Sequence, residues 1–239
     1  MRSLLREAQP ADNKYSRGVV GFVTGSIKFP GAAILGVTAA MRTGLGMVRY
    51  LGPTEVSNLL IEARPEAVLV GGKADAWVIG SGVPNGDPRI AEALKFDGRK
   101  ILDAGSITVE NLAKLTERDF VTPHLGEAER IGCQDLAALT ALTEAVVVLK
   151  GSVTQIGQRG CEPVAVGPNP AELATAGTGD VLAGILGALT AANPEVSGME
   201  LAAFAVELHA EAARVAVEAG PVAALDVAEA VRSVVKAWS

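Results

Sequence analysis

The sequence predicts a single α/β domain over residues 1–239, built on a mainly parallel sheet with helices on both faces. Short apolar runs alternate with helical patterns through the first two thirds of the chain, which is typical of right-handed crossovers between parallel strands. The last third is nearly all helical. No internal repeat, charge block or low-complexity stretch divides the 239 residues, a length near the upper end for one domain.

Six short apolar runs bounded by Gly, Pro, Asp or Asn are the predicted parallel strands. They are residues 19–24, 47–51, 76–79, 100–102, 120–122 and 145–149. Between them, apolar residues recur at helical spacing over 32–43, 54–62, 88–94, 108–115 and 126–131. A hairpin follows at 154–156 and 162–166, and then helices at 180–192, 197–218 and 223–238.

Composition excludes several classes of partner and location. The formal net charge is −6, the wrong sign for binding nucleic acid or an anionic membrane surface. No apolar run reaches the ~18 residues that span a bilayer, and the N-terminus lacks the apolar core of a secretory signal, so a cytoplasmic protein is expected. The two cysteines, Cys133 and Cys161, have no zinc-ligand spacing with His124 and His209, and we expect both thiols to be buried.

The strongest chemical signal is the segment from Leu173 to Gly184, LATAGTGDVLAG. Gly177 and Gly179 remove side chains where a helix is expected to begin at Asp180, so successive backbone N–H groups can converge on a phosphate. Asp180 can simply stabilise the helix dipole. A carboxylate nevertheless repels an anion, so its position favours a base that takes a proton from an attacking hydroxyl.

Two further strands end in polar residues at the expected ligand-binding edge of the sheet. The segment FVTPHLGE presents His124 and Glu127 directly after a strand, and the sequence leaves open whether they bind a ligand or cap the next helix. The segment VVVLKGS delivers Lys150 before a glycine turn, which suits a phosphate but also fits plain surface charge.

Taken together, these segments resemble the ADP/ATP-dependent NAD(P)H-hydrate dehydratases, a branch of the ribokinase-like superfamily. The resemblance runs from about Lys14 to the last helix. It rests on VTGS, PGAA, MRTGLGMV, TPHLGE, LKG and ATAGTGDVLAG. The combination of GTGD with TPHLGE is specific to the dehydratase branch, because related vitamin kinases usually have asparagine where this chain has His124.

The resemblance implies a ribokinase-like three-layer fold and a set of site residues. Positions matching those that hold the hydrated nicotinamide nucleotide are Ala32, Gly82, His124 and Asp180. Positions matching the loop for the ADP or ATP phosphoryl donor are Lys150, Gly151, Ser152, Val153, Thr154, Gly177, Thr178 and Gly179. Asp180 matches the catalytic base, and Glu127 is expected to approach Mg²⁺ through water.

The implied reaction is dehydration of the (6S) hydrate of NADH or NADPH, that is NADHX or NADPHX, with release of phosphate. A small-molecule kinase of the same superfamily and a non-catalytic nucleotide sensor are the alternatives. A homo-oligomer such as a tetramer is expected, and the N-terminal epimerase domain of many relatives is not. This chain departs from the family in the loop Leu102-Asp103-Ala104-Gly105-Ser106-Ile107, which lacks a second acidic residue, in Ser81 of the Gly80-Ser81-Gly82 turn, and in a short span from Glu127 to Lys150.

Overall fold

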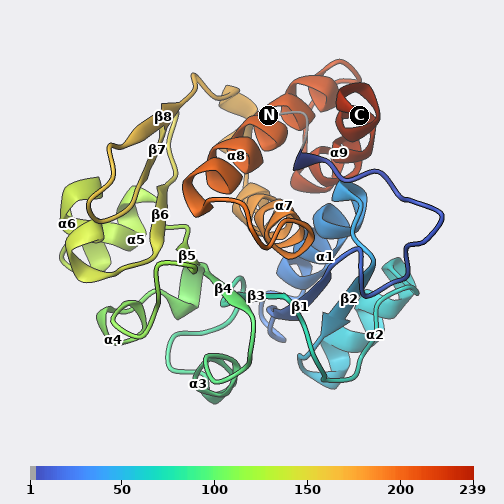
Figure 1. The fold of residues 1–239 in the computed structure, drawn as a ribbon, viewed down its shortest axis with the longest axis horizontal. Coiled ribbons are helices and arrows are strands. Elements are labelled where there is room, and N and C mark those ends of the chain that lie inside the picture. The colour runs from blue at the N-terminus through green and yellow to red at the C-terminus, as the bar shows by residue number, and fades with distance from the viewer. Residues whose placement is uncertain (1–3) are drawn as a thin grey trace.

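The computed structural model describes residues 4–239 and contains one eight-stranded sheet (Figure 1). The strand order is β2-β1-β3-β4-β5-β6-β7-β8, and the pairings from β2 to β6 are parallel. The strands are β1 Val19–Val23, β2 Met47–Tyr50, β3 Ala76–Ile79, β4 Arg99–Leu102, β5 Phe120–Val121, β6 Val146–Leu149, β7 Thr154–Gly157 and β8 Val164–Val166. β7 and β8 add an antiparallel hairpin at one edge.

Helices cover both faces of this sheet, giving three layers. One face is covered by α1 Gly31–Thr43, α2 Thr54–Ala63, α7 Thr178–Ala192, α8 Gly198–Val217 and α9 Ala224–Trp238. The other face is covered by α3 Pro88–Ala93, α4 Val109–Leu112, α5 Leu125–Arg130 and α6 Leu136–Leu142. Two short 3₁₀ turns, η2 Ala104–Ser106 and η3 Ala171–Leu173, lie in the connections.

Alternation along the strands divides the core in two, because successive side chains point to opposite faces of a sheet. Val146 and Val148 pack in the cluster under α7 and α8, whereas Val147 and Leu149 pack in the cluster under α5 and α6. The parallel strands β1 to β6 are largely buried on both faces, which explains why they read as nearly continuous apolar runs in the sequence, whereas β8 is mostly exposed.

The predicted strands, the hairpin and most of the helices are confirmed, usually within two residues. The helix expected to begin at Asp180 begins instead at Thr178. Helix α6 was not predicted, and Asp135 caps its N-terminus by accepting from the Ala138 N–H at 2.8 Å. The expectation of two buried thiols is wrong for Cys161, which is exposed on the turn between β7 and β8, whereas Cys133 is buried. Among the helices described, none is long and apolar enough to cross a membrane.

Candidate active site

A cavity of about 700 Å³ opens at the carboxyl ends of β4, β5 and β6, against the start of α7. Ten of the residues expected from the sequence line it together: His124, Glu127, Lys150, Gly151, Ser152, Thr154, Gly177, Thr178, Gly179 and Asp180. The volume falls in the range of small-molecule sites. Segments that are distant in the chain therefore converge on one ligand-sized space.

The glycine turn places the start of α7 at the edge of this cavity. Gly177 is the N-cap and has a φ of +94°, a backbone conformation that favours glycine. A Cβ there would also lie 2.5 Å from the Leu35 Cδ1 atom. Thr178 holds the turn by donating its hydroxyl to the Leu173 carbonyl oxygen at 2.7 Å and the Thr175 carbonyl oxygen at 2.9 Å. The Thr178 N–H donates to the Thr175 carbonyl oxygen at 3.3 Å, whereas the N–H groups of Gly179 and Asp180 lack partners within the helix and are suited to bind an anion.

Asp180 lies in the first turn of α7, where it is partly buried. Its pKa is raised from 3.8 to about 7, chiefly by burial and by the nearby Asp103 carboxylate, with Lys150 opposing the shift and Glu127 adding to it. A carboxylate poised near neutral pH is well matched to general-base catalysis. The same Asp180 at its ordinary pKa would be a much weaker base.

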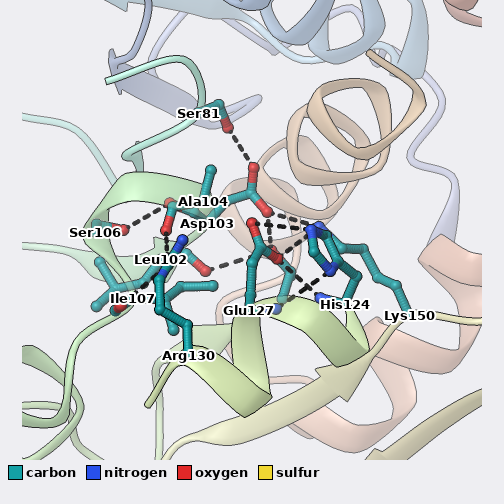
Figure 2. A network of polar contacts seen from close by, with 11 residues as sticks. Ser81, Leu102, Asp103, Ala104, Ser106, Ile107, His124, Glu127, Arg130 and Lys150 are labelled. Atoms are coloured by element: carbon teal, nitrogen blue, oxygen red, sulfur yellow. Dashed lines mark hydrogen bonds and ion pairs between the residues drawn. The ribbon is translucent and has the colours of Figure 1, made fainter. Parts of the chain in front are cut away.

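Lys150 is the cation of the site and is not plain surface charge, because its side chain is only 17% exposed. Its Nζ lies 2.8 Å from Asp103 Oδ1 and 3.8 Å from Glu127 Oε2 (Figure 2). Burial alone would lower the pKa of Lys150, but the Asp103 and Glu127 charges raise it, so the ammonium stays protonated. A Cβ at Gly179 would lie 3.2 Å from this Nζ, so the bare backbone of the glycine turn faces the lysine directly.

Asp103 is the main site residue that the sequence did not single out. It follows β4 and is almost fully buried, and it accepts hydrogen bonds from the hydroxyls of Thr122 and Ser81 at 2.8 Å each, in addition to its contact with Lys150. The signal was present, since a lone aspartate at the end of a buried strand is rarely incidental. The neighbouring position 105 requires glycine for a structural reason, because a Cβ there would lie 1.8 Å from the Val83 carbonyl oxygen.

His124 and Glu127 do cap the following helix. Glu127 Oε2 accepts from the His124 N–H at 2.8 Å, and His124 Nδ1 accepts from the Glu127 N–H at 3.2 Å, which together form a capping box on α5. The His124 side chain is nevertheless 59% exposed and lines the cavity. Capping therefore fixes the orientation of the ring, and Nε2 lies 3.7 Å from Glu127 Oε1, beyond hydrogen-bond distance, where it can still meet a ligand.

His209 is a second site residue that the sequence did not indicate. It lies on α8, is 6% exposed, and lines the cavity. Its Nε2 atom has no hydrogen-bond partner among the described residues. Burial, with the Lys150 charge acting in the same direction, lowers its pKa to about 4, so the ring is neutral. The available clue was a histidine on the buried, apolar face of this amphipathic helix, beside Ala205 and Ala212.

Three expected ligand residues do not line this cavity. Val153 is 46% exposed on the loop before β7. Ala32 and Gly82 lie against each other, and a Cβ at Gly82 would approach the Ala32 Cβ to 2.6 Å. Ala32 follows the carboxyl end of β1, and Gly82 follows the carboxyl end of β3. They therefore lie at the same ends of the strands as the cavity, but beside β1 and β3 and not beside β4, β5 and β6.

The carboxylates of the cavity do not form a direct Mg²⁺ site. Residues 4–239 contain no group of three His, Cys, Asp or Glu side chains that could hold a metal ion. Glu127 is already engaged by the His124 N–H, and Lys150 occupies the space beside Asp103. The carboxylate oxygens suit an ion that keeps its water and is carried by a polyphosphate, but not one bound directly by the protein.

The fold and the glycine turn at the start of α7 define the class of the protein as ribokinase-like. Ribokinase from Thermotoga maritima shares the fold, with a TM-score of 0.64 over 92% of this chain and 99% of that chain at 15% identity. Much closer in shape is the ADP/ATP-dependent NAD(P)H-hydrate dehydratase from Bacillus subtilis, co-crystallised with ATP and Mg²⁺. Its TM-score is 0.83 at 27% identity, covering 100% of this chain and 96% of that chain.

Within that class, the model of the NAD(P)H-hydrate dehydratase family matches residues 20–233, and the chain belongs to this family. It is 30% identical over 243 residues to the ADP-dependent (S)-NAD(P)H-hydrate dehydratase of Neisseria meningitidis, covering 89% of this chain and 81% of that protein. It is also 36% identical over 205 residues to the bifunctional NAD(P)H-hydrate repair enzyme Nnr of Mycobacterium tuberculosis, covering 77% of this chain. That match spans only 43% of the bifunctional relative's length.

Proposed function

We propose that this chain catalyses the dehydration of the (6S) hydrate of NADH or NADPH, using ADP or ATP as phosphoryl donor and Mg²⁺. The observation that carries the proposal is the position of Asp180, a carboxylate with a pKa near 7 in the first turn of α7, between the glycine turn and Lys150. A base beside an anion site is what transfer of a phosphoryl group to a hydroxyl requires.

The chemistry follows from the poor leaving ability of hydroxide. Asp180 accepts the proton of the C6 hydroxyl while the hydroxyl oxygen attacks the terminal phosphoryl group, and the bond from that phosphorus to the donor oxygen breaks to release AMP or ADP. The N–H groups of Gly177 and Gly179, with the Lys150 ammonium, stabilise the charge on the phosphoryl oxygens, and Thr178 holds the turn that presents them. The ring nitrogen lone pair then expels phosphate, and loss of the C5 proton restores the reduced nicotinamide.

The remaining residues are assigned by the same scheme. The phosphoryl donor lies along Lys150, Gly151, Ser152, Val153 and Thr154. The nicotinamide hydrate lies toward His124, with Ala32 and Gly82 further along the same edge of the sheet. Glu127 would approach, through water, a Mg²⁺ ion carried by the polyphosphate, and that ion would neutralise charge on the phosphate oxygens. The enzyme is further proposed to act as a homotetramer, which light scattering of the purified protein tests.

A direct assay tests the function. The protein is incubated with NADHX or NADPHX, Mg²⁺ and either ADP or ATP, and absorbance of the restored reduced nicotinamide is followed together with free phosphate. We expect both to appear in equal amounts and only when nucleotide is present. Nucleotide consumption with a stable phosphorylated acceptor and no free phosphate would instead identify a small-molecule kinase.

A further inference from the structure

A second cavity of about 620 Å³ lies at the opposite ends of the strands from the candidate active site. It is formed at the amino ends of β3, β4 and β5 and against the last turn of α7. Five of its lining side chains are basic and three are acidic, in a chain whose formal net charge is −6. This cavity therefore carries an excess of positive charge, although the protein as a whole is negatively charged.

Arg99 is the central cation of this cavity. It is 6% exposed, its guanidinium lies 4.9 Å from the centre of the Phe120 ring, and its Nε donates to the Arg118 carbonyl oxygen at 2.6 Å. Within residues 4–239 no carboxylate is in ion-pair contact with this guanidinium, although the nearby Asp119 charge partly offsets its burial and the neighbouring Arg118 charge. A buried charge with no counter-ion in contact is costly, and the terminal N–H groups of the guanidinium form a fork that matches phosphate.

The acidic side chains of the cavity offset the Arg99 charge only without direct contact, chiefly through Asp119, whose charge favours the protonated guanidinium. Asp119 is buried, and its two oxygens accept from the Lys100 N–H at 2.7 Å and from the Thr116 N–H and hydroxyl at 2.8 and 2.9 Å. Asp75 accepts from the Val19 N–H at 2.8 Å. These two carboxylates are held by neutral donors of the backbone and a hydroxyl, and Asp97 is exposed.

A second unpartnered polar group lines the same space. Thr190, in the last turn of α7, is 1% exposed, and its hydroxyl has no hydrogen-bond partner among the described residues. Buried polar groups are nearly always satisfied by protein, water or ligand. A buried hydroxyl and a buried guanidinium that line one cavity both indicate an acceptor-rich ligand.

We propose that this cavity binds a small phosphorylated metabolite, of the phosphate monoester class, at a site separate from the active site. Arg99 and the exposed Lys73 and Lys114 meet the phosphate, and the Thr190 hydroxyl donates to it. The organic part lies against Leu94 and Leu115, which also line the cavity. Its volume is large enough for such a molecule.

Trp77 provides a reporter for binding. Its indole N–H donates to the carbonyl oxygen of Asp97, a cavity residue, at 2.9 Å. The other tryptophan, Trp238 at the end of α9, packs on Phe204 of α8. In a Trp238→Phe protein, titration with glycerol 3-phosphate is expected to change Trp77 emission saturably, and glycerol is expected to have no effect.

Variants decide which site is responsible. Arg99→Met is expected to weaken glycerol 3-phosphate binding at least tenfold, and the exposed Lys73→Gln, which preserves the core, to weaken it severalfold. The charge-balanced Asp103→Asn/Lys150→Met protein, altered only in the active cavity, is expected to bind as the parent does. The proposal is overturned if the Trp238→Phe parent does not bind glycerol 3-phosphate. It is also overturned if the double variant loses binding while Lys73→Gln binds as the parent does. None of these measurements uses turnover. If the second-site proposal fails, the proposed dehydratase reaction is therefore unaffected and is tested by its own assay.

Discussion

Lys150 Nζ lies 2.8 Å from Asp103 Oδ1, and this buried ion pair sits beside the carboxylate of Asp180. Lys150 and Asp103 shift the pKa of Asp180 in opposite directions. The pair therefore anchors the site in the fold and also tunes the proposed base. Activity, pH dependence and stability should respond to it in linked ways.

Replacing Asp180 by asparagine should remove the base while keeping the shape of the site. Turnover of the hydrate is expected to fall by about 100- to 10,000-fold, the usual effect of losing a general base. Nucleotide affinity measured by calorimetry should be kept or improved, because a negative charge leaves an anion site. Near-normal turnover in Asp180→Asn would refute the assignment of the base.

The pH dependence should follow the raised pKa of Asp180. Below about pH 7 this carboxyl is protonated and cannot accept a proton, so kcat/KM is expected to fall about tenfold per pH unit on the acid side. Asp103→Asn removes a charge that raises this pKa, so its acid limb should move to lower pH. An acid limb that stays in place in Asp103→Asn would mean that another group controls it.

The raised pKa of Asp180 also predicts how the stability of the protein changes with pH. The change is opposite in direction to that caused by a salt-bridged aspartate, whose pKa is lowered. Because the folded-state pKa of Asp180 is about 7 and its ordinary value is 3.8, the unfolded chain binds fewer protons than the folded chain between these values. Stability is then lost as pH rises through that window. Asp180→Asn should be more stable than the parent at pH 8, on the order of 1 to 4 kcal/mol, and equal to it near pH 3. Thermal unfolding measures this, with the exposed Glu129→Gln as control.

Lys150→Met should harm both the fold and nucleotide binding, and the two effects can be separated. Removing one partner leaves the buried Asp103 charge uncompensated, which typically costs about 3 to 5 kcal/mol. The Asp103→Asn/Lys150→Met double variant should recover most of this stability, because no buried charge remains unpaired. Its nucleotide affinity should stay weak. Recovery of normal affinity in the double variant would show that Lys150 does not bind the phosphates.

His124 combines a capping and a proposed ligand role, and asparagine separates them. Asn is a good N-cap, so His124→Asn should retain the α5 cap, whereas His124→Ala should lose about 0.5 to 2 kcal/mol of stability. Both variants remove the imidazole and should lower kcat/KM for the hydrate by the loss of one hydrogen bond, about 0.5 to 1.5 kcal/mol. Nucleotide affinity should barely change. A nucleotide-binding defect with intact use of the hydrate would reverse the assignment of the two ligands.

Local pattern in the sequence was enough to predict the sheet, the terminal hairpin and the glycine turn. Short β-branched runs and helical spacing are local signals, and buried parallel strands express them strongly. The residues that follow β5, β6 and the glycine turn were identified for the same reason, because each follows a recognisable element directly. The resemblance of those segments to one family then supplied the function.

Only the tertiary structure decided how those residues act on one another. Asp103 and Lys150 are separated by 47 positions, and His209 belongs to a helix whose pattern is otherwise that of core packing. Their contacts depend on strand order and on how α7 and α8 pack over the sheet, which are long-range properties. The pKa of Asp180 and the surroundings of the buried Arg99 guanidinium depend on burial and on charges from several distant segments of the chain. No short stretch of sequence contains them.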